Sequence, residues 1–95
     1  MNISLKNSGN VLFFLDFETT GFGHPREIVE VCLLAVSAVE TQFFHAYVLP
    51  TKESSDSALA VHRLNKPKLR SLGANEWPEV SRAMDIFIER QVCTF

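Results

Sequence analysis

The apolar run VLFFL at residues 11–15, which leads directly into two acidic side chains, most constrains what this chain can fold into. Five successive apolar residues predict a buried strand with both faces covered. Asp16 and Glu18 follow at its end, and they share one face because side chains alternate along a strand. Two neighbouring carboxylates repel each other and are costly to desolvate. A cation between them would offset that cost, and carboxylate oxygens are the ligands that magnesium or manganese prefers.

The residues after the acidic pair are suited to holding a ligand. Thr19 and Thr20 supply hydroxyl groups and backbone donors. Gly21 can adopt a positive φ, which lets a ligand approach the backbone closely. The alternative for such a short pattern is an ordinary strand-to-loop turn with solvated acids. The complete segment ETTG after an apolar strand favours the metal site.

Three apolar segments predict the sheet of one small α/β domain. The strands are expected over residues 11–18, 28–37 and 42–50. The short links between them predict a three-stranded antiparallel meander. Residues 1–10 are expected to form a flexible leader, so that the folded domain would cover residues 11–95.

Two helices are predicted after the sheet. The segment ALAVHRL at residues 58–64 forms a short helix that Asp56 or Ser57 can cap. Pro78 stands in the first turn of a longer helix, which ends near Gln91. Apolar side chains of the longer helix fall on one face, which is expected to pack on the sheet. They are Val80, Met84, Phe87 and Ile88.

The run FLDFETTGF at residues 14–22 resembles the first motif of the DEDD exonucleases of the DEDDh type, the 3′-to-5′ proofreading and repair enzymes. Weaker similarities, notably to three-prime repair exonucleases, follow in the order of the family. They are EIVEVCLLAV (27–36), ALAVHRLNKPKL (58–69) and GANEWPEV (73–80). The resemblance spans about residues 11–91. It implies a ribonuclease-H-like α/β fold and hydrolysis of phosphodiester bonds at nucleic-acid 3′ ends.

The resemblance also implies roles for single residues. Asp16 and Glu18 would be catalytic and would bind Mg²⁺ or Mn²⁺, two ions in the complete family site. Contacts to the 3′ end of single-stranded DNA or RNA would come from Thr19, Thr20, Gly21, Phe22 and His62. Phe22 would stack on a base, and its alternative is a core position under the loop. The alternative for His62 is a polar surface group.

The later motifs of the family do not occur in these 95 residues. The third acid of the family lies in a pattern like H-N-x-x-F-D, and the fourth follows a histidine by five positions. None of the three histidines here has an aspartate at that spacing. We therefore expect a truncated, N-terminal part of the catalytic domain, and the alternative is a non-catalytic nucleic-acid-binding or regulatory fragment. The strand that carries Asp16 would be an exposed edge, open to self-association.

The formal net charge of −2 gives no general attraction to nucleic acid, so contacts would be local and metal-assisted. The basic residues Arg63, Lys66, Lys68 and Arg70 can bind phosphates, or they belong to a solvated connector over residues 66–77. Trp77 is expected to be a packing anchor rather than a stacking platform for bases.

No apolar run is long enough to cross a membrane, and the first ten residues lack the apolar segment of a signal peptide. Cys32 is expected to be a small core residue, and Cys93 lies far from it in sequence. An intracellular location, cytoplasmic or nuclear, is the simplest interpretation, and a disulfide between the two cysteines is the alternative.

Overall fold

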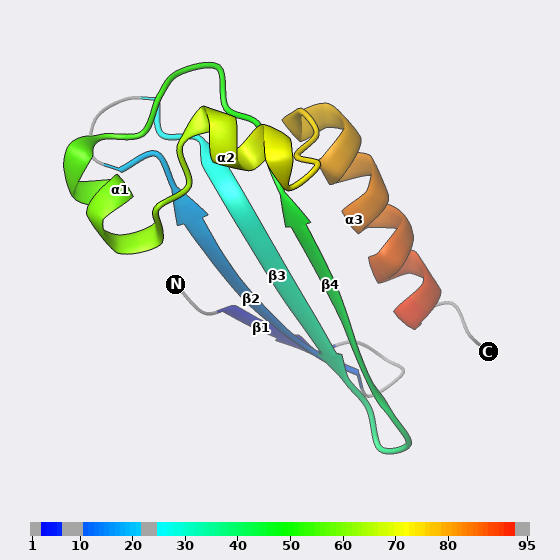
Figure 1. Ribbon diagram of the computed structural model, residues 1–95. Coiled ribbons are helices and arrows are strands. Elements are labelled where there is room, and N and C mark those ends of the chain that lie inside the picture. Colours follow the sequence, from blue (N-terminus) through cyan, green and yellow to red (C-terminus); the bar gives the residue numbers. More distant parts are fainter. Residues whose placement is uncertain (1–2, 7–10, 22–24, 93–95) are drawn as a thin grey trace.

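The computed structural model describes residues 3–6, 11–21 and 25–92, which form a mixed α/β fold (Figure 1). The described strands form one antiparallel sheet in the order β1-β2-β3-β4. The elements are β1 (Ile3–Lys6), β2 (Leu12–Thr19), β3 (Ile28–Val36), β4 (Thr41–Tyr47), α1 (Asp56–His62), α2 (Lys66–Ser71) and α3 (Trp77–Val92). The predicted antiparallel meander of β2, β3 and β4 is therefore confirmed. In the described part of the chain, no helix is both long and apolar enough to cross a bilayer.

The prediction of a flexible leader is wrong for Ile3–Lys6. These residues form β1, which pairs with β2 between Leu12 and Leu15. An apolar strand at a sheet edge presents unpaired backbone groups, and β1 satisfies them along this stretch. The pairing stops at Leu15, so in the described residues no strand lies on the outer side of residues 16–19. The predicted open edge is therefore confined to the acidic end of β2.

One face of the sheet forms the core with α3. Phe13, Leu33 and Ala35 are buried on this face, and β3 alternates between buried and partly buried residues along its length. The predicted apolar face of α3 is confirmed, because Val80, Met84, Phe87 and Ile88 all pack against the sheet. The rings of Phe44 on β4 and Phe87 on α3 lie 5.8 Å apart between centroids.

The opposite face of the sheet carries both carboxylates. In the register of β2 and β3, Asp16 lies opposite Cys32 and Glu18 lies opposite Glu30. The two acids therefore share a face, as the strand pattern predicts. Leu12 is also on this face and is 38% exposed, so the prediction that both faces of this strand are buried is wrong. The reason is that α3 packs only on the other face.

Cys32 is partly exposed on the acidic face, so its prediction as a core residue is wrong. Its strand is uniformly apolar around it, and composition alone does not show which alternate residues face α3. Val31, Leu33 and Ala35 do so, and Cys32 alternates with them. Cys32 is a free thiol in the described part of the chain, and Cys93 lies outside it.

The predicted connector over residues 66–77 contains the helix α2. Asn65 caps it by accepting a hydrogen bond from the Lys68 N–H at 2.9 Å, and Pro67 stands in its first turn. Leu69 is fully buried and packs with Leu64 and the start of β3. A helix of six residues is too short to show a helical period in sequence, which is why the pattern does not predict it. Figure 1 shows α1 and α2 at the end of the sheet where β2 ends and β3 begins.

Arg63 ends α1 in the left-handed conformation, with φ 61° and ψ 24°. Its N–H donates to the Leu59 carbonyl at 2.9 Å, a bond that helix ends usually make through glycine. This conformation costs a residue with a Cβ about 1–2 kcal/mol, which a glycine would avoid. The greater conformational freedom of glycine in the unfolded chain offsets part of that stabilisation.

We therefore expect Arg63→Gly to raise the free energy of unfolding by about 0.5–1 kcal/mol, as measured by urea denaturation. Arg70→Gly inside α2 is the matched control, and it should lower the free energy of unfolding by about 1 kcal/mol. A loss of stability in both variants would contradict the prediction.

Candidate functional site

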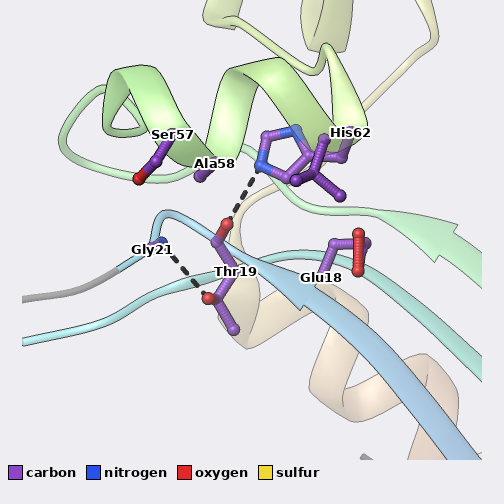
Figure 2. Close-up of a pocket in the computed structure, with 7 residues that line it drawn as sticks. Glu18, Thr19, Gly21, Ser57, Ala58 and His62 are labelled. Atoms are coloured by element: carbon purple, nitrogen blue, oxygen red, sulfur yellow. Dashed lines mark hydrogen bonds between the residues drawn. The ribbon is translucent and has the colours of Figure 1, made fainter.

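A cavity of about 290 Å³ lies where the end of β2 meets α1 (Figure 2). Its lining consists of Glu18, Thr19, Gly21, Ser57, Ala58, Val61 and His62. Four of these residues are predicted site residues, and they come from the end of a strand and from a helix far along the chain. The volume is close to the lower end of the range for small-molecule pockets, about 300–1,000 Å³. The cavity therefore has the size for one small ligand group.

A bulge shapes the strand ends beside the cavity. Glu18 lies opposite Glu30, but the next residue, Thr19, lies opposite Ile28. Val29 is therefore an extra residue in β3, and its carbonyl accepts a hydrogen bond from Val48 N–H at 2.8 Å. Bulges change the direction in which neighbouring side chains point, and they are common beside functional sites.

Thr20 has a structural role behind the cavity. It is 3% exposed, and it is not among the residues that line the cavity. Its N–H donates to the Glu27 carbonyl at 2.9 Å, and its hydroxyl accepts from the Glu27 N–H at 3.2 Å. Its carbonyl accepts from the Ser55 N–H at 2.8 Å. Thr20 thus joins the end of β2 to both the residue before β3 and the start of α1.

The carboxylate of Glu27 holds the loop between β4 and α1. Its oxygens accept hydrogen bonds from the Thr51 N–H at 2.8 Å, the Thr51 hydroxyl at 2.9 Å and the Lys52 N–H at 3.1 Å. The Thr51 backbone hydrogen bond is the largest cause that lowers the pKa of Glu27 below its usual 4.5. Glu27 is therefore an ordered anion that fixes the chain next to the cavity.

We expect Glu27→Gln to lower the free energy of unfolding by about 1 kcal/mol at neutral pH, a value reduced for the partial exposure of the group. The folded-state pKa is lowered, so the stabilisation is complete above pH 4.5 and is lost as the pH falls through the lowered pKa. The stabilities of the two proteins should converge in acid, as measured by urea denaturation across pH. Glu40→Gln on an exposed turn should change stability by less than about 0.5 kcal/mol at pH 7.

Gly21 lets the end of β2 approach the start of α1. Its φ is +105°, and a Cβ at this position would lie 2.3 Å from the Ser55 hydroxyl oxygen. Ser55 is the N-cap of α1, because its hydroxyl accepts from the Ala58 N–H at 3.2 Å. The prediction of Asp56 or Ser57 as the cap is therefore wrong: the helix begins at Asp56, and the extended residue before it takes the capping position.

His62 lines the cavity, and both of its ring nitrogens are hydrogen-bonded to the backbone. Its Nδ1 accepts from the Leu64 N–H at 2.9 Å, so Nδ1 carries no proton. The proton of the neutral ring is then on Nε2, which donates to the Thr19 carbonyl at 3.0 Å. Figure 2 shows the ring turned toward Thr19, which itself accepts a hydrogen bond from the Gly21 N–H through its hydroxyl. His62 therefore ties α1 to β2.

The remaining predicted residues lie in different places. Asp16 is exposed on the same sheet face as Glu18, but it does not line the cavity. Phe22 lies outside the described residues. Among the described residues, no three histidine, cysteine, aspartate or glutamate side chains are grouped so that they could hold a metal ion. Of the basic residues Arg63, Lys66, Lys68 and Arg70, Lys66 donates a hydrogen bond from its ammonium group to the Thr51 carbonyl at 2.9 Å.

Three lining residues were not predicted from the sequence: Ser57, Ala58 and Val61. Their signal is their spacing, because residues at i, i+3 and i+4 share a helix face. Once His62 is placed in the cavity, Ala58 and Val61 lie on or beside the same face of α1. The resemblance places His62 near the end of β2, but helix spacing alone does not show which neighbours of His62 also line the cavity.

Comparison with known proteins gives no assignment, since no family model matches the chain and no curated protein is significantly similar to it. The resemblance to the DEDD exonucleases therefore stays a prediction that rests on the segment FLDFETTGF and the segments that follow it. Function has to be argued from the cavity and from the acidic face of β2.

Proposed function

We propose that this chain is the N-terminal part of a metal-dependent 3′-to-5′ exonuclease with a ribonuclease-H-like fold. One observation supports the proposal most: Glu18, Thr19, Gly21 and His62 line one cavity at the acidic end of β2. The 3′-terminal nucleotide of a single strand of DNA or RNA would enter this cavity. Its last phosphodiester bond would then lie near Asp16 and Glu18.

Asp16 and Glu18 would hold the Mg²⁺ or Mn²⁺ ions. The donor set fits, because both side chains offer carboxylate oxygens and share a sheet face. When bound, the ions would help activate water and stabilise the leaving oxygen. Two carboxylates are a partial ligand set, so the complete site would need further acids from outside the residues described.

The other lining residues would bind and orient the nucleotide. Val61 is 77% exposed and offers apolar surface to a base or sugar. The Ser57 hydroxyl, which pairs with that of Ser55 at 3.2 Å, can also bond a ligand hydroxyl. His62 would contact the nucleotide through its ring, since both nitrogens already have backbone partners. It would thus set the shape of the cavity rather than move a proton.

Paramagnetic Mn²⁺ tests the proposal on the chain itself. Substoichiometric Mn²⁺ should broaden the backbone amide signals of residues 16–21 first, in ¹H–¹⁵N spectra. Asp16→Asn and Glu18→Gln should each remove that selective broadening, and Glu40→Gln should leave it unchanged. Broadening that is uniform, or that persists in both acidic variants, would overturn the assignment of the metal site.

A nuclease assay separates the proposed enzyme from the alternative, a non-catalytic fragment that binds nucleic acid. The assay uses a 3′-labelled single strand with Mg²⁺, and cleavage must disappear in Asp16→Ala. Because two carboxylates are a partial ligand set, binding without cleavage favours the non-catalytic alternative only where that binding is unchanged by Mg²⁺ and by Asp16→Ala. Cleavage that survives Asp16→Ala would rule out this site as its source.

Self-association through the open edge of β2 is part of the same proposal. The backbone of residues 16–19 has β3 on one side and, within the described residues, no strand on the other. Such an edge can accept a strand from a second chain.

A further inference from the structure

A second cavity, of about 310 Å³, lies beside the first residues of β3 and the segment that follows β4. Its lining includes Arg26, Glu27, Ile28, Leu49, Pro50 and Trp77. Glu27 links the two cavities, because it is hydrogen-bonded to Thr20, whose chain neighbours Thr19 and Gly21 line the first one. Figure 1 shows the start of β3, the end of β2 and the start of α3 at the same end of the sheet.

Trp77 gives this cavity an aromatic wall. It stands at the start of α3 and is 40% exposed, so its prediction as a packing anchor is wrong. The indole is a stiff aromatic group in the lining, where the other apolar residues are Ile28, Val48, Leu49 and Pro50. An exposed aromatic face of this kind is a surface on which a base can stack.

Arg26 and Glu27 are the two charged groups in the lining of the second cavity. The carboxylate of Glu27 is already held by Thr51 and Lys52, so it stays ordered at the rim. The guanidinium of Arg26 is the cationic group of the lining, and guanidinium groups form paired hydrogen bonds with phosphate. An aromatic face beside a guanidinium suits a planar ring that carries an anionic group.

We propose that the second cavity binds a nucleotide of the single strand whose 3′ end occupies the first cavity, with its base against Trp77 and its phosphate at Arg26. The choice of a nucleotide rests on the proposed function. The volume admits one ring system with its sugar and is near the lower end for small-molecule pockets, about 300–1,000 Å³. The competing occupant is an apolar side chain of a peptide, which would use Trp77 and Pro50 without Arg26.

Intrinsic fluorescence tests this proposal directly, because Trp77 is the single tryptophan of the chain. The probe is a short single strand of thymidine nucleotides, added without metal. Saturable quenching of Trp77 is expected. Arg26→Gln should weaken binding at least about fivefold, and Arg82→Gln, an exposed cation on α3 that does not line the cavity, should leave it unchanged.

A second readout is the anisotropy of the same strand with a 5′ fluorescein label. Trp77→Ala should weaken binding by about five- to 150-fold, since one stacked base contributes that range. Circular dichroism of each variant checks that it is folded. The proposal would be overturned if Trp77→Ala and Arg26→Gln bound the strand as tightly as the unchanged chain. A dissociation constant from quenching above about 1 mM would also overturn it.

The outcomes also separate this proposal from the proposed function. Asp16→Asn and Glu18→Gln should remove the metal-dependent signal at residues 16–21 without altering the lining of the second cavity, and Glu40→Gln, which lines neither cavity, is the control for unchanged quenching of Trp77. Quenching with no metal-dependent signal at residues 16–21 would retain the second cavity and overturn the exonuclease. Selective Mn²⁺ broadening at residues 16–21 without quenching of Trp77 would retain the exonuclease proposal and overturn the second cavity as a nucleotide site. Quenching by a proline-rich peptide, and not by the oligonucleotide, would assign the cavity to a peptide and overturn the proposal.

Discussion

Replacing Gly21 with alanine is expected to lower the free energy of unfolding by about 2–4 kcal/mol and to deform the cavity at the end of β2. The backbone at Gly21 has a φ of +105°, which residues with a Cβ rarely adopt. The new methyl group would also lie 2.3 Å from the Ser55 hydroxyl and 3.1 Å from the Ala58 methyl. Ser55 must move, and its movement breaks the cap of α1.

Gly73→Ala is the matched control for this prediction. Gly73 also has a positive φ, +77°, but an added Cβ there meets no atom within 4 Å. It should therefore cost only the backbone term, about 1–2 kcal/mol. Urea denaturation of the two variants gives the difference, and ¹H–¹⁵N spectra should show larger shifts in α1 for Gly21→Ala. Equal losses of stability would mean that the contact with Ser55 contributes nothing.

The sequence predicts the parts of the fold that have a long hydrophobic period. The strands β2, β3 and β4 and the apolar face of α3 all follow from such patterns. The shared face of Asp16 and Glu18 follows from strand alternation alone. The sequence patterns miss two short elements, β1 with four residues and α2 with six. Neither is long enough to show a hydrophobic period. Both are held by tertiary partners, a neighbouring strand and the burial of Leu69.

The candidate site is predicted in composition but not in the role of each residue. Glu18, Thr19, Gly21 and His62 do come together, although β3 and β4 separate the end of β2 from His62 in the sequence. The buried hydrogen bonds of Thr20 and the two backbone partners of His62 depend on three-dimensional contacts that no local pattern encodes. The same holds for Ser55, which becomes a cap only because the chain is extended there.

The position of Cys32 illustrates a different limit. A uniformly apolar strand predicts burial but not which alternate residues face the core, and a shift of one residue exchanges the two faces. The register of β3 with β2 places Cys32 beside Asp16, on the face away from α3. The sheet partners, rather than the strand itself, decide this assignment.

Replacing His62 with phenylalanine is expected to lower the free energy of unfolding by about 2–3 kcal/mol. Phenylalanine also has an aromatic ring but no ring nitrogens, so the Leu64 N–H and the Thr19 carbonyl lose their partners. Both groups are partly buried, and a buried polar group without a partner costs about 1–3 kcal/mol. The loss should be seen in urea denaturation together with increased amide exchange at Leu64.

His45→Phe is the matched control for His62→Phe. The His45 Nε2 lies 2.6 Å from a Glu30 oxygen, and the two side chains are 34% and 28% exposed. A side-chain contact so open to water contributes about 0–1 kcal/mol, and phenylalanine is well accepted in a strand. His62→Phe should therefore cost clearly more than His45→Phe. A direct check is the ¹⁵N spectrum of the imidazoles at pH 8, where His62 should carry its proton on Nε2 alone; a proton on Nδ1 would contradict the role of His62 as the tie between α1 and β2.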